Sequence, residues 1–151
     1  MRNAEHLLDV LRHVRPLQQY TAKVIASTLA ETEVTLPIRA VLEQLDASGP
    51  STVPQLARSL LVPRQVVQRL ADSANEIGLV EYVPNPAHQR SRLLRLTPAG
   101  RDMFGTFLEQ EMAMVAPLAA TFSEEDIEAC ARVIAALTEG MREVAQRLDG
   151  D

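Results

Sequence analysis

The feature that most constrains the fold is a pair of helices predicted end to end within residues 52–78. Thr52 and Gln55 have the spacing of a capping box, which begins a helix. Pro63 follows within about two helical turns, so this first helix must be short. A second, longer helix begins at Pro63 and ends before Gly78. A short helix, a tight apolar turn and a longer helix together predict a helix-turn-helix.

Behind this pair of helices the pattern changes from helical to strand-like. Residues 79–83 and 92–96 are short apolar segments separated by a proline-rich polar loop, which predicts a β-hairpin. A further helix is predicted over 36–48, ahead of the pair. The sequence therefore predicts a winged helix-turn-helix over about 36–97, with the hairpin as its wing.

Long amphipathic helices are predicted on both sides of this unit, over about 4–31 and about 98–148. Pro16 is expected to kink or break the first, and Pro117 to end or bend the helix that begins at residue 98. The predicted fold is mainly α with a small β-hairpin wing, as a single domain over 1–151.

The apolar stripes of these outer helices need a partner. The chain is 46% hydrophobic but short, so one copy offers limited core to cover them. A second copy would supply that cover, because obligate dimer interfaces resemble a divided protein core. We therefore expect a homodimer whose interface is formed by the first and last helices.

Charge is unevenly distributed along the chain. The net charge is −5, which by itself argues against a nucleic-acid partner. Residues 58–101, however, carry seven arginines against three acidic residues, while residues 102–151 carry three arginines against eleven acidic residues. Attraction to phosphate depends on the local field, so this basic segment keeps DNA binding open.

The second helix of the pair has one polar side suited to reading DNA. Its apolar stripe is expected to pack on the preceding short helix. The opposite side carries Arg64, Gln65, Gln68, Arg69 and Asp72. Arginine pairs with guanine and glutamine with adenine in the major groove, where a recognition helix lies. The alternative is an ordinary amphipathic helix with a solvated face.

The hairpin tip is basic as well. Arg90 and Arg92 follow His88 in the loop, where a wing can lay arginine along the DNA backbone or into a narrow minor groove. A hairpin tip is also polar simply because it is solvated, so both interpretations stay open for these residues.

Nearly the whole chain resembles the MarR (multiple antibiotic resistance regulator) family. The most specific part runs from Leu56-Ala57-Arg58 through residues 61–70, and ends in Leu96-Thr97-Pro98-Ala99-Gly100 directly after the wing. The resemblance implies a homodimer in which each winged helix reads one half-site of a near-palindrome in double-stranded DNA. It also implies a repressor that releases DNA when a small phenolic or other apolar acid binds.

The resemblance places an effector pocket where the outer helices meet the winged helix. Polar groups on the first helix that suit a carboxylate and a ring are His13, Arg15 and Tyr20. The alternative is that these side chains are solvated or lie in the dimer interface.

Two departures from the family pattern concern DNA binding. Family wings usually carry an aspartate two residues before the arginine that matches Arg90, and this chain has His88 there. Recognition helices of the family often carry serine or threonine where this chain has Pro63, Gln65 and Val66. These differences leave two points open: how the wing arginine is oriented, and which side chains contact the DNA phosphates.

Other classes of function receive little support from the sequence. The glycines are isolated and the histidines have no metal-ligand spacing, so we expect no enzyme, cofactor or metal site. No segment is long and apolar enough to cross a membrane, and the single cysteine, Cys130, is expected to be buried and structural in a cytoplasmic protein. The remaining alternative is a winged-helix module that binds protein rather than DNA.

Overall fold

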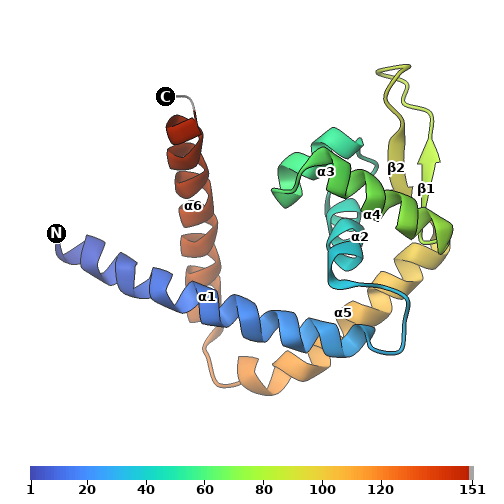
Figure 1. The fold of residues 1–151 in the computed structure, drawn as a ribbon. Coiled ribbons are helices and arrows are strands. Elements are labelled where there is room, and N and C mark those ends of the chain that lie inside the picture. Colours follow the sequence, from blue (N-terminus) through green and yellow to red (C-terminus); the bar gives the residue numbers. More distant parts are fainter. Residues whose placement is uncertain (150–151) are drawn as a thin grey trace. The chain divides into compact units, whose positions relative to one another are not determined.

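The computed structural model of the chain describes residues 1–149. Internal contacts divide the chain into two units, Met1–Met112 and Ala113–Asp151. In chain order the elements are α1 (Arg2–Leu29), α2 (Leu36–Ser48), α3 (Val53–Leu60), α4 (Arg64–Glu76), β1 (Val80–Val83), β2 (Leu93–Leu96), α5 (Pro98–Ala119) and α6 (Glu124–Asp149), drawn in Figure 1. The predicted fold class is confirmed, whereas the assignment of 1–151 to a single domain stays a prediction.

Side-chain caps set the bounds of α2 and α3. Thr35 accepts a hydrogen bond from the Ile38 backbone amide at the start of α2, and Gly49 ends that helix with a φ of 72°. Thr52 and Gln55 form the predicted capping box, in which Thr52 N donates to Gln55 Oε1 at 2.8 Å. These local interactions satisfy amides that have no partner within the helix, so they fix the helix starts independently of tertiary packing.

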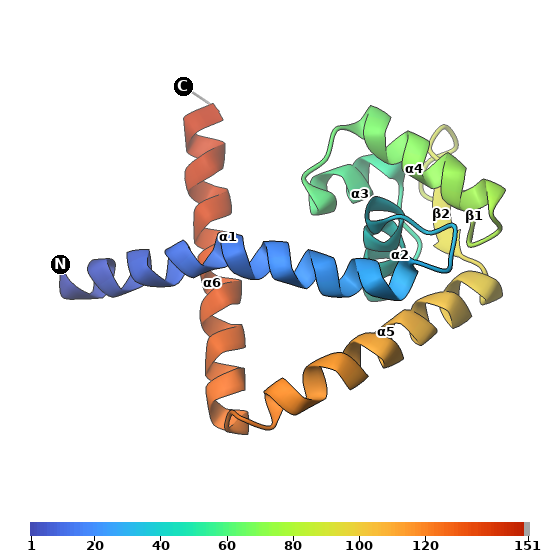
Figure 2. The ribbon, with the colours of Figure 1, turned by 60° about the horizontal axis from the view of Figure 1, so that its bottom comes forward.

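A tight turn joins α3 to α4. Leu61 has a left-handed backbone with a φ of 55°, and Val62 N donates to Ala57 O at 3.1 Å. The sequence predicted Pro63 to lie in the first turn of α4. In the structure Pro63 is instead the N-cap of that helix. The two helices pack against each other and on α2, which completes the helix-turn-helix (Figures 1 and 2).

The wing is an antiparallel hairpin of β1 and β2, with Val80 opposite Leu96 and Tyr82 opposite Leu94. The segment before α3 contacts β2 through an isolated β-bridge, in which Ser51 and Leu94 exchange backbone hydrogen bonds of 3.0 and 2.8 Å. Side chains alternate across the hairpin, so Val80 and Leu94 are buried while Glu81 and Arg95 pair in solvent at 2.9 Å.

The start of α5 packs against Gly78 and Leu79, which lie between α4 and β1. Thr97 Oγ1 donates to Gly78 O at 2.6 Å and accepts from Gly100 N at 3.0 Å. A Cβ added to Gly100 would lie 1.9 Å from the Leu79 carbonyl oxygen. The Thr-Pro-Ala-Gly segment after the wing therefore has a physical basis: a hydroxyl cap and a glycine that allows two backbones to touch.

Neither proline ends its helix, and the prediction for the cysteine was wrong. Of the kink or break expected at Pro16, the break does not occur, because α1 is a single helix with Pro16 inside it, and the kink stays a prediction. Pro117 likewise lies inside α5, which continues to Ala119. A proline costs one backbone hydrogen bond, which a long helix can lose without ending. Cys130 is exposed in the chain rather than buried.

Candidate nucleic-acid interface

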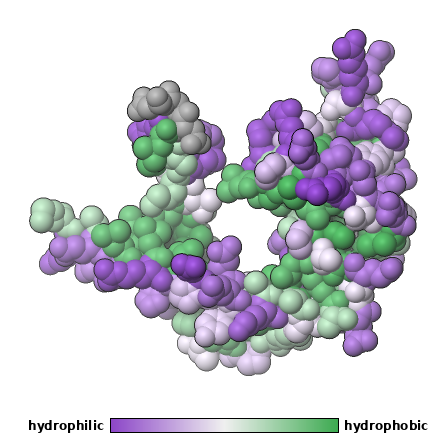
Figure 3. Space-filling model, viewed as in Figure 1, coloured by the Kyte–Doolittle hydropathy of each residue, from purple (hydrophilic) through white to green (hydrophobic). Residues whose placement is uncertain are grey.

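The polar side of α4 is exposed as the sequence predicts. Val67, Ala71 and Ala74 are fully buried and hold the helix against the core. The side chains exposed on the other side are Arg64, Gln65, Gln68, Arg69 and Asp72. In Figure 3 the surface of this helix and of the neighbouring hairpin tip is predominantly hydrophilic. The geometry thus leaves Arg64, Gln65 and Arg69 without a side-chain partner among residues 1–149.

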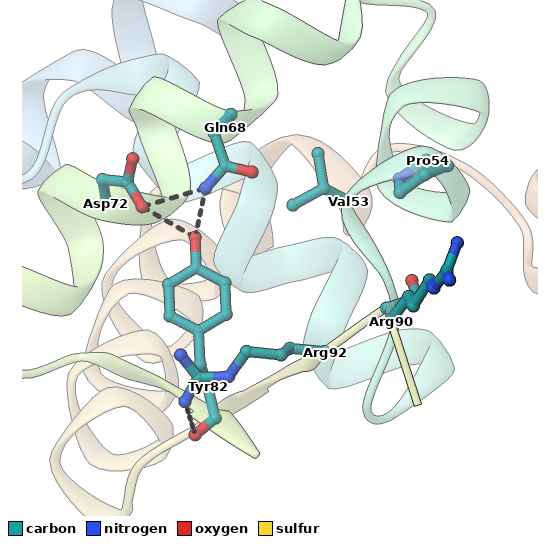
Figure 4. A pocket seen from close by; sticks show the side chains of 8 residues that line it. Val53, Pro54, Gln68, Asp72, Tyr82, Arg90 and Arg92 are labelled. Carbon is teal, nitrogen blue, oxygen red and sulfur yellow. Dashed lines mark hydrogen bonds between the residues drawn. The ribbon is translucent and has the colours of Figure 1, made fainter. Parts of the chain in front are cut away.

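Three of the polar side chains between α4 and the wing form a closed network (Figure 4). Gln68 Nε2 donates to Tyr82 Oη at 2.7 Å and to Asp72 Oδ1 at 3.0 Å. Tyr82 Oη in turn donates to Asp72 Oδ1 at 2.8 Å. The network joins the middle of α4 to β1.

Tyr82 is strongly affected by this environment. Burial, together with the hydrogen bond to the Asp72 carboxylate and the charge of that carboxylate, raises the pKa of its phenol to about 12. The phenol is therefore a neutral hydrogen-bond donor throughout the physiological range. Tyr82 was not among the residues predicted from the sequence, although strand alternation places it on the same face of the hairpin as the buried Val80.

The two wing arginines lie differently. Arg92 points back toward Tyr82 in Figure 4: its Nη2 donates to Tyr82 O at 3.1 Å, and its guanidinium lies 5.1 Å from the centre of the ring. Arg90 extends away from this network and makes no interaction with any side chain among residues 1–149. Arg92 thus belongs to the wing's own structure, while Arg90 is free for a partner.

The wing tip is held without the aspartate that the family pattern suggests. Asn85 Oδ1 accepts from Ala87 N at 3.0 Å, and His88 N donates to Asn85 O at 3.2 Å. An Asx turn and the contact between Arg92 and Tyr82 therefore support the hairpin in place of a charged pair at His88. Between α3, α4 and the wing lies a groove of about 410 Å³, lined by Val53, Pro54, Gln68, Asp72, Tyr82, Arg90, Ser91 and Arg92.

The predicted effector residues are not brought together in one pocket. Tyr20 is exposed and lines a hollow of about 460 Å³ on α1 with Gln19, Ala22 and Lys23. Lys23 Nζ lies 5.7 Å from the centre of the Tyr20 ring. His13 and Arg15 are exposed on the same helix but do not line this hollow.

Residues 1–149 contain no cluster of three or more histidine, cysteine, aspartate or glutamate side chains able to hold a metal ion. Across the same part of the chain, every helix is too short or too polar for a membrane span.

Comparison with known proteins identifies the family. The family model described as MarR family matches residues 35–91, from the N-cap of α2 to the wing. The crystal structure of the MarR family transcription regulator SP03579 is 34% identical, with a TM-score of 0.77 over 96% of each chain. The PcaV transcriptional regulator of Streptomyces coelicolor, solved in complex with its natural ligand, shares the fold at 22% identity, with a TM-score of 0.62 over 83% of this chain and 88% of that one.

A curated relative covers a smaller part of the chain. An uncharacterised protein of Mycobacterium tuberculosis is 44% identical over 63 residues, which are 42% of this chain and 44% of that protein. The chain therefore spans less than half the length of the curated relative it matches. The likeness to SP03579, by contrast, covers 96% of this chain. With the 35–91 match and this near-complete structural relative at 34% identity, the chain belongs to the MarR family of transcription regulators.

Proposed function

We propose that the protein is a ligand-responsive repressor that binds a pseudo-palindromic site in duplex DNA as a homodimer. The observation that carries this proposal is the exposed polar face of α4, where Arg64, Gln65 and Arg69, like Arg90 of the wing, have no side-chain partner among residues 1–149. Free arginine and glutamine on a recognition helix suit base edges, and a free wing arginine suits the backbone or the minor groove. Such a role requires access to the genome, so we also propose a cytoplasmic location and no enzymatic activity.

The homodimer is supported by apolar side chains that one chain leaves in solvent. On α1 these exposed residues include Leu7, Leu8, Val10, Val14 and Leu17, and on α6 they include Ile127, Val133, Ile134, Met141, Val144 and Leu148. Apolar side chains exposed in numbers along one helix mark interaction sites. A two-fold dimer through α1 and α6 would present two recognition helices, and its half-sites would be separated by about one turn of DNA or a multiple of it.

The effector we propose is a small aromatic or apolar acid. The hollow on α1 supports this, because Lys23 offers a cation to a carboxylate and Tyr20 offers a ring face to an aromatic group. His13 and Arg15 remain proposed contributors. Benzoate is the probe: it should release DNA from the wild type, and a Tyr20→Ala/Lys23→Ala variant should bind DNA normally but respond less.

Duplex titration tests the DNA-binding proposal. Binding of a labelled duplex selected from a random pool should weaken steeply with salt and should exceed binding of random duplex at every salt concentration. Arg69→Ala should reduce discrimination between sites by about 1–3 kcal/mol. Arg90→Ala should weaken all duplexes evenly and reduce the salt slope.

Arg132→Ala serves as the matched control, because it removes an exposed arginine from α6, outside the winged helix. It should bind DNA like the wild type. Unchanged binding in both Arg69→Ala and Arg90→Ala, or the absence of any enriched duplex, would overturn the proposal and favour a winged-helix module that binds protein.

A further inference from the structure

The orientation of the Gln68 amide is dictated by its neighbours. The Asp72 carboxylate only accepts hydrogen bonds, and its Oδ1 accepts from both Tyr82 Oη and Gln68 Nε2. Because the single phenolic proton goes to Asp72, Tyr82 Oη faces Gln68 as an acceptor. Both neighbours of the amide are therefore acceptors. Turning the amide around would set its Oε1 against the carboxylate with no proton between them.

This orientation uses up the donors of Gln68. An amide nitrogen has two hydrogens, and here Nε2 faces two acceptors, Tyr82 Oη at 2.7 Å and Asp72 Oδ1 at 3.0 Å. The remaining polar atom is Oε1. Figure 4 shows it directed away from both partners, toward the side of the groove where Val53 lies. Gln68 thus offers an acceptor and no donor to a molecule in the groove.

Which bases a glutamine recognises depends on whether it offers an acceptor alone or both a donor and an acceptor. A glutamine that reads adenine in the usual bidentate way donates from Nε2 to N7 and accepts at Oε1 from the N6 amino group. In the major groove, amino donors are found on adenine N6 and cytosine N4, whereas guanine and thymine present acceptors at the corresponding positions. An acceptor alone therefore separates adenine and cytosine from guanine and thymine, and separates adenine from cytosine poorly.

We propose that Asp72 and Tyr82 are positioning residues that make Gln68 an acceptor-only reader, selecting adenine or cytosine through their amino groups. This inference rests on the proposed function, because it assumes that α4 lies in the major groove. It replaces the bidentate pairing with adenine that the sequence suggested for Gln68. Arg92 supports the arrangement from the wing, since it holds the ring and the carbonyl of Tyr82.

Selection of duplexes from a random pool tests the inference, using the full chain and four proteins. Gln68→Ala identifies the position that Gln68 reads, as the one whose base preference disappears. Tyr82→Phe/Asp72→Ala removes both acceptors and frees the amide, while keeping the ring beneath Arg92. Gln65→Ala supplies the matched comparison, because Gln65 is an exposed glutamine on the same helix that makes no side-chain hydrogen bond within residues 1–149.

In the wild type we expect adenine and cytosine in similar proportions at the Gln68 position. In Tyr82→Phe/Asp72→Ala the freed amide should read adenine bidentately, giving a preference for adenine over cytosine of about fivefold or more. The position identified by Gln65→Ala should keep its base preference in that variant. Loss of the Asp72 charge should strengthen binding to all duplexes alike, an effect that leaves base ratios unchanged.

Three results overturn the inference while leaving the proposed function intact. They are a wild type that already prefers adenine over cytosine at the Gln68 position, an unchanged ratio in Tyr82→Phe/Asp72→Ala, and a Gln68→Ala variant that selects the wild-type motif. If no motif is enriched by the wild type, the proposed function fails first. A thermal melt of each variant near that of the wild type confirms that the altered ratios report recognition rather than unfolding.

Discussion

The covered region, residues 29–107, and the helical residues outside it share the same amphipathic pattern but differ in how much of their apolar surface is buried. Every buried apolar side chain among residues 1–149 lies between Leu29 and Phe107. Leu42, in the first region, is fully buried, whereas Leu17 on α1 is 64% exposed. The comparison teaches that periodicity identifies the apolar face of a helix but not the surface that covers it. The apolar face of the winged helix is buried within the chain, whereas the apolar faces of α6 and of most of α1 stay exposed.

An ionic cluster marks the edge of the covered region. Arg39 on α2 donates from Nε and Nη2 to the two carboxylate oxygens of Glu111 on α5, at 2.8 and 2.6 Å, and from Nη1 to Glu43 at 2.8 Å. Its guanidinium lies 5.4 Å from the centre of the Phe104 ring. Burial lowers the pKa of Arg39, but its hydrogen bond to Glu111 and the charge of Glu43 outweigh burial, so the pKa rises above its ordinary value.

The largest effect is expected from Arg39→Met. The substitution leaves the Glu111 side chain, which is 16% exposed, without its counter-ion. Removing one partner of a buried ion pair lowers the free energy of unfolding by about 3–5 kcal/mol. Denaturant titration measures the loss. The double variant Arg39→Met/Glu111→Met should recover most of it, and a double variant as unstable as the single one would contradict an electrostatic origin.

The local chemistry of the sequence predicted most element bounds of the covered region. Thr35, Thr52 and Gly49 act within a turn of their own positions, so their roles can be read without the rest of the fold. Pro16 and Pro117 do not end their helices, because the cost of a proline is weighed against the whole helix around it. That balance depends on how each helix is packed, which residue spacing does not reveal.

The next largest effect directly contrasts the two regions. Leu42→Ala should lower the free energy of unfolding by about 2–5 kcal/mol, because it leaves a cavity in a closed core. Leu17→Ala should leave the winged helix as stable as before and instead raise the dissociation constant of the proposed dimer. Denaturant titration measures the first change, and light scattering over a range of protein concentrations measures the second.

Two results would contradict the proposed difference between the covered region and α1. A Leu17→Ala variant that associates like the wild type would remove α1 from the proposed interface. A stable wild-type monomer at micromolar concentration would remove the dimer itself. Leu42→Ala is its matched control, since it deletes the same atoms from a side chain that is fully buried within one chain.

The candidate site was predictable in its composition and not in its internal bonds. Helical periodicity placed Gln68 and Arg69 on the exposed side of α4, as the structure does. It gave no sign that Gln68 would bond a tyrosine 14 residues away, or that Arg92 would turn back onto the same tyrosine. Such contacts depend on how the hairpin lies against the helix, and on rotamers that follow from that placement.

The smallest effect concerns the two tyrosines, one in each region. The chain contains two tyrosines, so a Tyr20→Phe variant leaves Tyr82 as the sole source of tyrosinate absorbance. In that variant the absorbance should rise with a midpoint near pH 12, because burial and the Asp72 carboxylate raise the pKa of Tyr82 to about 12. Adding Asp72→Ala should lower this midpoint, and a midpoint at the ordinary value of about 10 in the Tyr20→Phe background would contradict the network.

The same shift has a consequence for stability whose sign is fixed. The folded chain holds the Tyr82 proton more tightly than the unfolded chain does, so this contribution to the free energy of unfolding is fully present below about pH 10. It is lost as the pH rises from there through about 12. Tyr82→Phe in the Tyr20→Phe background should remove this pH-dependent loss while leaving the core around Leu42 unchanged. The α4–wing contact is therefore the part of the covered region that alkali should loosen through a single, identifiable group.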